Sequence, residues 1–182
     1  MLDGDLYLAN DAQLVQMRKR ARKLTRFYNQ TTEDDDDRRS EILRELFGKT
    51  GQSFKIEPPF HCDYGSHISI GEEFYMNFGG IILDCAHVTI GNQVMCAPNV
   101  QLYAATHPLD AKLRCSGPEL AKPIKIGNRV WLGGGVIVCP GVTIGDNTVI
   151  GAGSVVVKDI PANVVAAGNP CRVIRQLPVP DD

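Results

Sequence analysis

Residues 126–160 read IGNRVW LGGGVI VCPGVT IGDNTV IGAGSV VVKDI, in hexads that each begin with Ile, Leu or Val. A large aliphatic side chain therefore recurs at every sixth position from Ile126 to Val156. The second position is mostly Gly and the fifth is small or β-branched, which suits a short strand followed by a bend. Neither an amphipathic helix nor a hairpin ladder has this period. The stretch predicts a mainly β protein, a parallel β-helix whose core is the column of aliphatic side chains.

The hexad pattern also extends upstream, at Ile70, Ile82, Ile90, Cys96 and Leu102, with a slip of two residues between Ile82 and Ile90. It stops between Ala105 and Pro123. That stretch is too long for a corner of the coil and predicts a loop extruded over 105–123. Long ordered loops on rigid scaffolds are common places for binding and catalytic residues.

The N-terminal part of the chain has a helical period instead. Within 11–47, one apolar stripe contains Leu14, Met17, Ala21, Leu24 and Tyr28. The opposite side is basic, with Arg18, Lys19, Arg20, Arg22, Lys23 and Arg26, and we interpret it as a solvated face rather than a phosphate site. Thr32 and Asp35 fit a capping pattern that starts a second helix, over about 33–47. These signals predict a helical segment at 1–53 and a β-helix with a C-terminal tail at 54–182.

Composition limits the classes of partner. The 182 residues carry 19 Lys and Arg against 21 Asp and Glu, a formal net charge of −2, so neither nucleic acid nor an acidic membrane is a favoured partner. The N-terminus does not resemble a secretory signal, and no apolar run approaches the roughly 20 residues of a membrane span. The six cysteines include no C-x-x-C pair. We expect a cytoplasmic protein without disulfides.

Several motifs accompany the hexads: FHCDYG at 60–65, MNF at 76–78, ATHP at 105–108, NRVWLGG at 128–134 and GNP at 168–170. Together with the helical N-terminus, they resemble the hexapeptide-repeat acyltransferases of the maltose and galactoside O-acetyltransferase type. The resemblance implies a left-handed β-helix and a homotrimer with active sites between subunits. It also implies acetyl-coenzyme A as the acetyl donor and a sugar as the acceptor. We expect no metal, because the sequence has no His-x4-His pair.

Acetyl transfer to a hydroxyl needs a general base, because an alcohol is barely ionised at neutral pH. The resemblance implies that His107 is this base, and Pro108 restricts the backbone of His107 to an extended conformation. Glu119 lies in the same loop, where its carboxylate is a candidate to orient the imidazole. The alternative for Glu119 is an ordinary exposed glutamate.

The resemblance also implies residues that contact the acceptor. Asn77 and Asp84 match such positions, and an amide with a carboxylate suits neighbouring hydroxyl groups. Asp63 and Asp11 are weaker candidates for the same role. The alternative for Asn77 is that its side chain satisfies a tight corner.

The donor-binding residues implied by the resemblance lie in the last coils and the tail: Trp131, Gly134, Ala152, Val157, Lys158, Arg172 and Arg175. Lys158 and the two arginines supply positive charge for phosphates. The alternatives are burial of Trp131 between subunits and ordinary surface positions for the cations.

Three other readings stay open from the sequence. His67, His87 and His107 are evenly spaced, as a zinc site of the carbonic anhydrase type would require, and residues 61–67 also contain potential ligands. A solenoid used only for binding or assembly is a second alternative. An acetyltransferase with a serine or antibiotic acceptor is the third.

Overall fold

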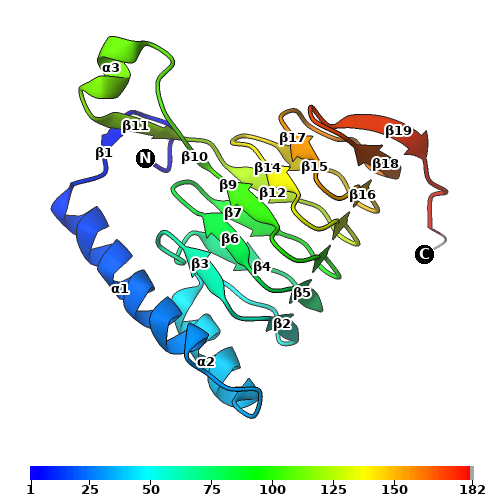
Figure 1. Cartoon of the computed structure of the whole chain (residues 1–182), viewed down its shortest axis with the longest axis horizontal. Coiled ribbons are helices and arrows are strands. Elements are labelled where there is room, and N and C mark those ends of the chain that lie inside the picture. Colours follow the sequence, from blue (N-terminus) through cyan, green and yellow to red (C-terminus); the bar gives the residue numbers. More distant parts are fainter. Residues whose placement is uncertain (181–182) are drawn as a thin grey trace.

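The computed structural model describes residues 1–180, and most of them form a parallel β-helix with a three-sided cross-section (Figure 1). A four-stranded side contains β4 (Ile68–Ile70), β7 (Val88–Ile90), β12 (Ile124–Ile126) and β15 (Thr143–Ile144). A five-stranded side contains β3 (Phe60–Cys62), β6 (Gly80–Leu83), β9 (Gln101–Tyr103), β14 (Ile137–Val138) and β17 (Val155–Val156). A seven-stranded side contains β2 (Phe54–Ile56), β5 (Phe74–Met76), β8 (Met95–Cys96), β13 (Trp131–Leu132), β16 (Val149–Ile150), β18 (Val164–Ala167) and β19 (Arg172–Gln176).

The aliphatic column of the hexads is the core of the coils. Leu132 pairs with Ile150 on one side and Val138 pairs with Val156 on the next, and all four side chains are fully buried. Each such burial contributes about 1.5–3 kcal/mol relative to an exposed side chain. The prediction of a hexad-built parallel β-helix is confirmed.

The coils have two lengths. In the later coils equivalent residues are 18 apart, as for Asn128 and Asp146, whereas in the earlier coils they are 20 apart, as for Glu72 and Asn92. This difference is the predicted slip of two residues. The extra residues lie between the five-stranded and the four-stranded side, at 63–67 and 84–87.

The same corner carries the extruded segment, which leaves the coil after β9 and returns at β12 (Figure 1). The sequence predicted a loop here, but the segment is largely regular. It contains β10 (Ala105–Thr106), α3 (Ala111–Cys115) and β11 (Pro118–Ala121), and β11 pairs with both β10 and β1 (Tyr7–Leu8) in an antiparallel sheet. These pairs satisfy backbone groups that an irregular loop would leave to water.

Helices α1 (Ala12–Asn29) and α2 (Asp36–Leu46) lie against the first coil (Figure 1). The predicted stripe of α1 faces the protein, with Ala21, Leu24 and Tyr28 buried. The second helix begins later than predicted, because the Asp35 carboxylate accepts hydrogen bonds from the backbone N–H and the hydroxyl of Thr32 and closes a turn before the helix. These two bonds also lower the pKa of Asp35.

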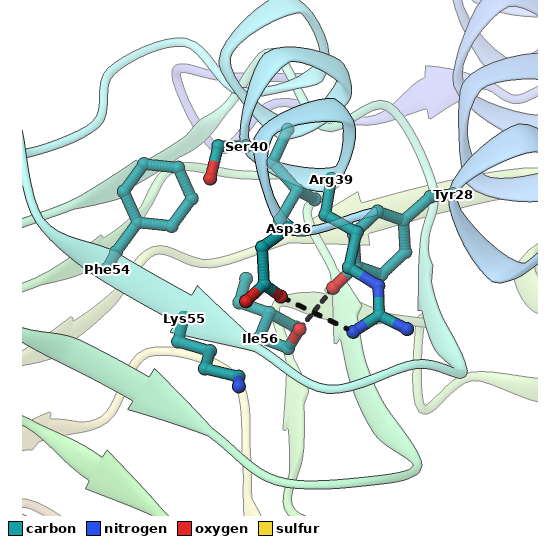
Figure 2. A pocket seen from close by; sticks show the side chains of 8 residues that line it. Tyr28, Asp36, Arg39, Ser40, Phe54, Lys55 and Ile56 are labelled. Carbon is teal, nitrogen blue, oxygen red and sulfur yellow. Dashed lines mark hydrogen bonds and ion pairs between the residues drawn. The ribbon is translucent and has the colours of Figure 1, made fainter. Parts of the chain in front are cut away.

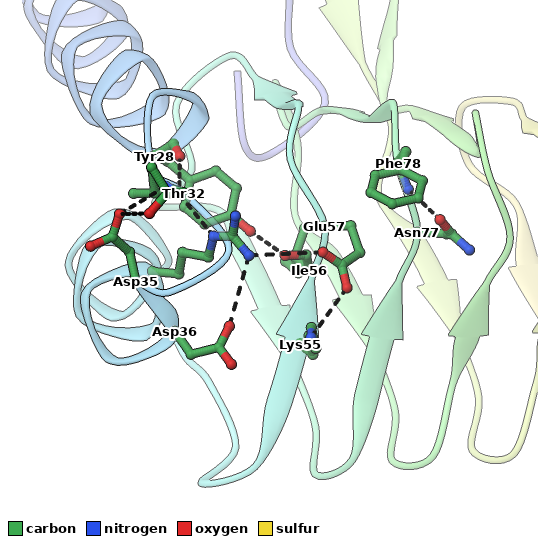
Figure 3. A network of polar contacts seen from close by, with 11 residues as sticks. Tyr28, Thr32, Asp35, Asp36, Lys55, Ile56, Glu57, Asn77 and Phe78 are labelled. Atoms are coloured by element: carbon green, nitrogen blue, oxygen red, sulfur yellow. Dashed lines mark hydrogen bonds and ion pairs between the residues drawn. The ribbon is translucent and has the colours of Figure 1, made fainter.

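A cavity of about 160 Å³ lies where α2 meets β2, with Phe54 and Tyr28 among its walls (Figure 2). Two of its polar side chains, Arg39 and Tyr28, form contacts that reach the first coil. Arg39 lies 3.8 Å from Asp36 and 3.9 Å from Glu57, and the Tyr28 hydroxyl donates to the carbonyl of Ile56 (Figure 3). These contacts join the helices to the first coil.

The six cysteines are free thiols. Across residues 1–180, no helix combines the length and the apolar character that a membrane crossing requires.

Candidate active site

Three of the candidate site residues follow strands of the five-stranded side. Asp63 follows β3, Asp84 follows β6, and the segment that carries His107 follows β9. Because these strands stack in parallel register, their carboxyl ends meet at one corner of the coil. The candidate site therefore consists of residues that lie where the hexad pattern is interrupted.

Asp84 is the buried centre of this corner. Its side chain is 0% exposed, and its carboxylate accepts the backbone N–H groups of Asp63 at 3.1 Å, Tyr64 at 2.9 Å and His67 at 3.3 Å. Burial raises the pKa of Asp84, although the N–H groups favour the ionised form. Within the single chain Asp84 holds the turn at Asp63, and its predicted contact with the acceptor stays a prediction.

Glu119 and His107 are the residues next to the last printed pair of β10 and β11. Thr106 of β10 pairs with Leu120 of β11, so the next residues in the antiparallel register are His107 and Glu119. From the other side, the hydroxyl of Tyr7 donates to the Glu119 carboxylate at 2.9 Å. Burial raises the pKa of Tyr7, and the neighbouring Cys85 and Glu119 raise it further, so Tyr7 is a protonated donor.

A cleft of about 280 Å³ opens at this corner, with Arg18, Asp63, Tyr64 and Glu119 among its walls. His107 is exposed and is not one of the residues that line the cleft. The single chain therefore forms one wall of a candidate site and leaves the imidazole accessible.

The walls of this cleft include Arg18 and Tyr64, which were not predicted to be site residues. Arg18 was assigned to a solvated helix face, but it is half-buried, donates to the Tyr64 hydroxyl at 2.9 Å and also donates to the carbonyl of Ala9. Tyr64 was noted only as part of the FHCDYG motif at 60–65, with no role assigned to it. No periodic signal distinguishes Arg18 from the arginines beside it, because its partners lie at distant positions in the chain.

Two acceptor candidates lie away from the cleft. Asn77 precedes β6 and Asp84 follows it, so the strand, about 13 Å long at four residues, separates them. The Asn77 side chain accepts the N–H of Phe78 at 2.8 Å (Figure 3), which is the corner role that the sequence analysis gave as its alternative. Asp11 caps α1 by accepting the N–H groups of Gln13 and Leu14. One chain does not bring Asn77 or Asp11 to the cleft.

Two of the donor candidates lie in one outward-facing row of the seven-stranded side. Trp131 pairs with Val149, Val149 with Val165, and Val165 with Arg175. With strands about 4.8 Å apart, the row from Trp131 to Arg175 is about 14 Å long. Trp131 is 49% exposed, so the row offers an aromatic face at one end and a cation at the other.

The other donor candidates lie at corners or in the tail. Gly134 accepts the N–H of Gly153 at 2.8 Å, which stacks its corner on that of Ala152 in the next coil. Val157 and Lys158 are exposed directly after β17, and Arg172 is exposed at the start of β19. All are accessible to a ligand that lies along the coils.

The histidines do not assemble a metal site in this chain. The rings of His67 and His87 lie 5.8 Å apart, and the Nδ1 atom of His67 is 2.7 Å from the carbonyl oxygen of Asp84. Within 1–180, no group of three or more His, Cys, Asp or Glu side chains is arranged to hold a metal ion.

A hexad-built β-helix with a helical cap and an exposed histidine on an extruded segment defines a hexapeptide-repeat acyltransferase. Residues 1–51 match the family model described as the maltose acetyltransferase hexapeptide capping motif, and residues 123–158 match the bacterial transferase hexapeptide repeats. The chain belongs to the maltose and galactoside O-acetyltransferase family.

Its relatives are similar over nearly their whole length. The galactoside O-acetyltransferase of Escherichia coli (strain K12) is 47% identical over 96% of this chain and 86% of its own. A maltose O-acetyltransferase from Clostridium difficile 630 has 55% identity and a TM-score of 0.97, over 98% of this chain and 95% of that chain. A galactoside acetyltransferase solved in complex with coenzyme A has 45% identity and a TM-score of 0.93, over 97% of this chain and 88% of that chain.

Proposed function

We propose that the protein transfers the acetyl group of acetyl-coenzyme A to a hydroxyl group of a sugar, with His107 as general base. The observation that supports this proposal is the pairing of Thr106 with Leu120, since His107 and Glu119 are their chain neighbours and Glu119 lines a cleft with other charged groups. A neutral imidazole accepts the hydroxyl proton while a carboxylate fixes its orientation.

The reaction then follows from ordinary acyl-transfer chemistry. As His107 takes the proton, the acceptor oxygen forms a bond to the acetyl carbon, and the negative charge develops on the carbonyl oxygen. Collapse of this intermediate breaks the carbon–sulfur bond, and the proton on His107 passes to the leaving thiolate. The backbone N–H of Gly134 is our candidate donor to the oxyanion, since a glycine permits close approach.

The donor site is the row from Trp131 to Arg175 with the adjacent corners. An aromatic face suits the apolar arm of coenzyme A, and Lys158, Arg172 and Arg175 suit its phosphates. Gly134 and Ala152 lie at the corner that adjoins this row, whereas Val157 and Lys158 follow β17 at the corner of the extruded segment and reach the donor from another subunit. The relative solved with coenzyme A, similar in fold over nearly the whole chain, supports coenzyme A as the carrier of the acetyl group.

The site is completed by a second copy, and the chain forms a homotrimer. Outward-facing residues on the four-stranded side are polar, as at Thr89 and Lys125, whereas the other two sides carry apolar rows. On the seven-stranded side the row is Tyr75, Met95, Trp131, Val149 and Val165, and on the five-stranded side it includes Ile81, Ile137 and Val155. Two different apolar faces on each chain are what a closed ring of head-to-tail contacts needs.

In such a ring the five-stranded face of one subunit meets the seven-stranded face of the next. The His107 corner of one subunit then lies beside the donor row of its neighbour, and Asn77 contributes to the acceptor site across the interface. The free thiols fit a reducing compartment, and we place the protein in the cytoplasm.

The test is release of coenzyme A thiol with a panel of glucose, maltose and galactosides, for the wild type and for His107→Ala. We expect turnover of at least one sugar and a loss of about a hundredfold or more in kcat for His107→Ala. Binding of coenzyme A, measured by calorimetry, should stay within about twofold, since His107 acts on the acceptor side.

His87→Ala is the matched control, because His87 is exposed on the same corner but outside the extruded segment. It should keep wild-type turnover. A His107→Ala enzyme with more than about a tenth of wild-type kcat would remove His107 from the mechanism.

A further inference from the structure

We propose that the acceptor cleft continues along α1 into a second subsite, formed by Arg22, Arg26 and His61, which binds an anionic group on a longer saccharide. The anionic group is a carboxylate, sulfate or phosphate that lies away from the hydroxyl receiving the acetyl group. The assignment of this subsite to an acceptor rests on the proposed function.

The two parts of the site are continuous. The cleft at Glu119 and a second groove, of about 340 Å³, share Arg22 as a wall. The second groove is lined by Arg22, Thr25, Arg26, Asn29 and Gln30 of α1 and the end of the helix and by His61 of β3. A ligand that starts beside Glu119 therefore reaches the second groove by passing Arg22.

The helical spacing sets the length of this path. Arg18, Arg22 and Arg26 follow one another at four-residue steps and so lie along one side of α1. From Arg18 to Arg26 the helix rises about 12 Å. A single sugar ring does not reach from one end to the other, so a ligand that uses both ends has two or more rings.

The charge in the second groove is not neutralised. In the part of the chain that the structure describes, neither the Arg22 nor the Arg26 side chain forms a hydrogen bond or an ion pair, and no carboxylate lines the groove. The Arg26 guanidinium only stacks over the Phe27 ring, at 5.5 Å. By contrast, Arg18 donates to Tyr64 and Ala9. Two free guanidinium groups with an imidazole nearby favour an anion over a neutral sugar.

The floor of the groove is rigid. The Asn29 side chain donates to the carbonyl of Phe60 and accepts its N–H, at 2.9 Å and 2.8 Å, which fixes the end of α1 to β3 beside His61. The Thr25 hydroxyl donates to the carbonyl of Ala21 within the helix. The cations therefore extend from a fixed surface, which lowers the ordering cost of binding.

Maltose and maltose 1-phosphate are a suitable pair of probes, because they differ only in the phosphate. We expect kcat/KM at low salt to be about five- to tenfold higher for maltose 1-phosphate, and the preference to shrink as salt is raised. In Arg22→Gln/Arg26→Gln the ratio of kcat/KM for maltose 1-phosphate to kcat/KM for maltose should fall to about one, and this ratio is the readout because Arg22 is also a wall of the acceptor cleft. The control Arg38→Gln/Lys125→Gln removes two cations elsewhere and should keep the preference.

Calorimetry with the same two sugars, without acetyl-coenzyme A, separates this proposal from the proposed function. If neither sugar is acetylated but the wild type binds maltose 1-phosphate more tightly than Arg22→Gln/Arg26→Gln does, the acetyl transfer to these sugars fails and the anion subsite stands. Equal binding of both sugars to the wild type overturns the subsite. An equal loss of preference in the control variant also overturns it, because the effect would then be one of overall charge.

Discussion

The hydroxyl of Tyr7 connects the N-terminus to the proposed catalytic histidine. Tyr7 pairs with Glu119 across β1 and β11 and donates to its carboxylate. Glu119 precedes Leu120, whose partner Thr106 precedes His107. Tyr7 is a positioning residue in this arrangement, since it acts through Glu119.

Tyr7→Phe removes the hydroxyl and keeps the ring. We expect kcat to fall about three- to tenfold, which corresponds to one hydrogen bond of about 1 kcal/mol, with KM for acetyl-coenzyme A unchanged. In a Glu119→Gln background the same substitution should have no further effect on kcat, because the bond it removes acts on the carboxylate. Equal losses from Tyr7→Phe in both backgrounds would show that Tyr7 acts independently of Glu119.

The corner after β6 shows how an interruption of the repeat becomes a site. The extra residues of the early coils need backbone partners that the regular ladder does not supply, and the Asp84 carboxylate provides acceptors for three N–H groups. The two extra residues of each early coil thus leave backbone N–H groups that the buried carboxylate of Asp84 accepts.

Asp84→Asn replaces one acceptor oxygen by an amide donor that faces these N–H groups. We expect a loss of about 1–3 kcal/mol in the free energy of unfolding at pH 7, measured in urea. Because burial raises the pKa of Asp84, its folded state holds a proton more tightly than the unfolded chain does. Its contribution to stability is therefore full below the unfolded value of about 3.9 and decreases as the pH rises toward the folded value.

In Asp84→Asn the free energy of unfolding should depend less on pH in the range above about 3.9, where Asp84 of the wild type loses its proton. Asp159→Asn, at an exposed corner of a later coil where the carboxylate accepts the N–H of Thr143, serves as a comparison. If Asp84→Asn is as stable as the wild type at pH 7, the corner does not depend on the carboxylate.

At the scale of the whole molecule, the outward residues of the four-stranded side are polar, whereas the other two sides carry apolar residues, and the proposed trimer rests on this asymmetry. Met95 is 52% exposed and lies in the apolar row between Tyr75 and Trp131. A free monomer would leave this row in water, whereas the proposed ring of three copies would bury it against the five-stranded face of a neighbour.

Met95→Glu places a charge in the centre of that face. We expect the wild type to have the mass of a trimer in light scattering and the variant to have the mass of a monomer, since an unpaired buried charge is costly. Thr89→Glu, which points outward from the polar side, should remain trimeric. A Met95→Glu protein that is still a trimer would exclude this face from the interface.

The sequence predicts the structure of the coils better than the structure of the candidate site. The period of six sets the β-helix and its buried column, as at Leu132 and Ile150, because each hexad repeats the same local choice of strand, inward side chain and bend. The position of His107 outside the coils also follows from the break in the pattern. The strands inside the extruded segment do not, since β1 and β11 pair across more than a hundred residues.

By itself, the sequence determined the class of fold, the helical cap and the list of candidate site residues, because these depend on local periods and on residue types. Only the tertiary structure decided which of them meet. It paired the strand of Glu119 with the strand before His107 and buried Asp84 under a turn. It also placed Arg18 and Arg22 in the wall of the cleft and Arg26 in the groove that continues from it. The physical reason is that such contacts depend on how coils stack and where distant strands pair, and neither leaves a period in the sequence.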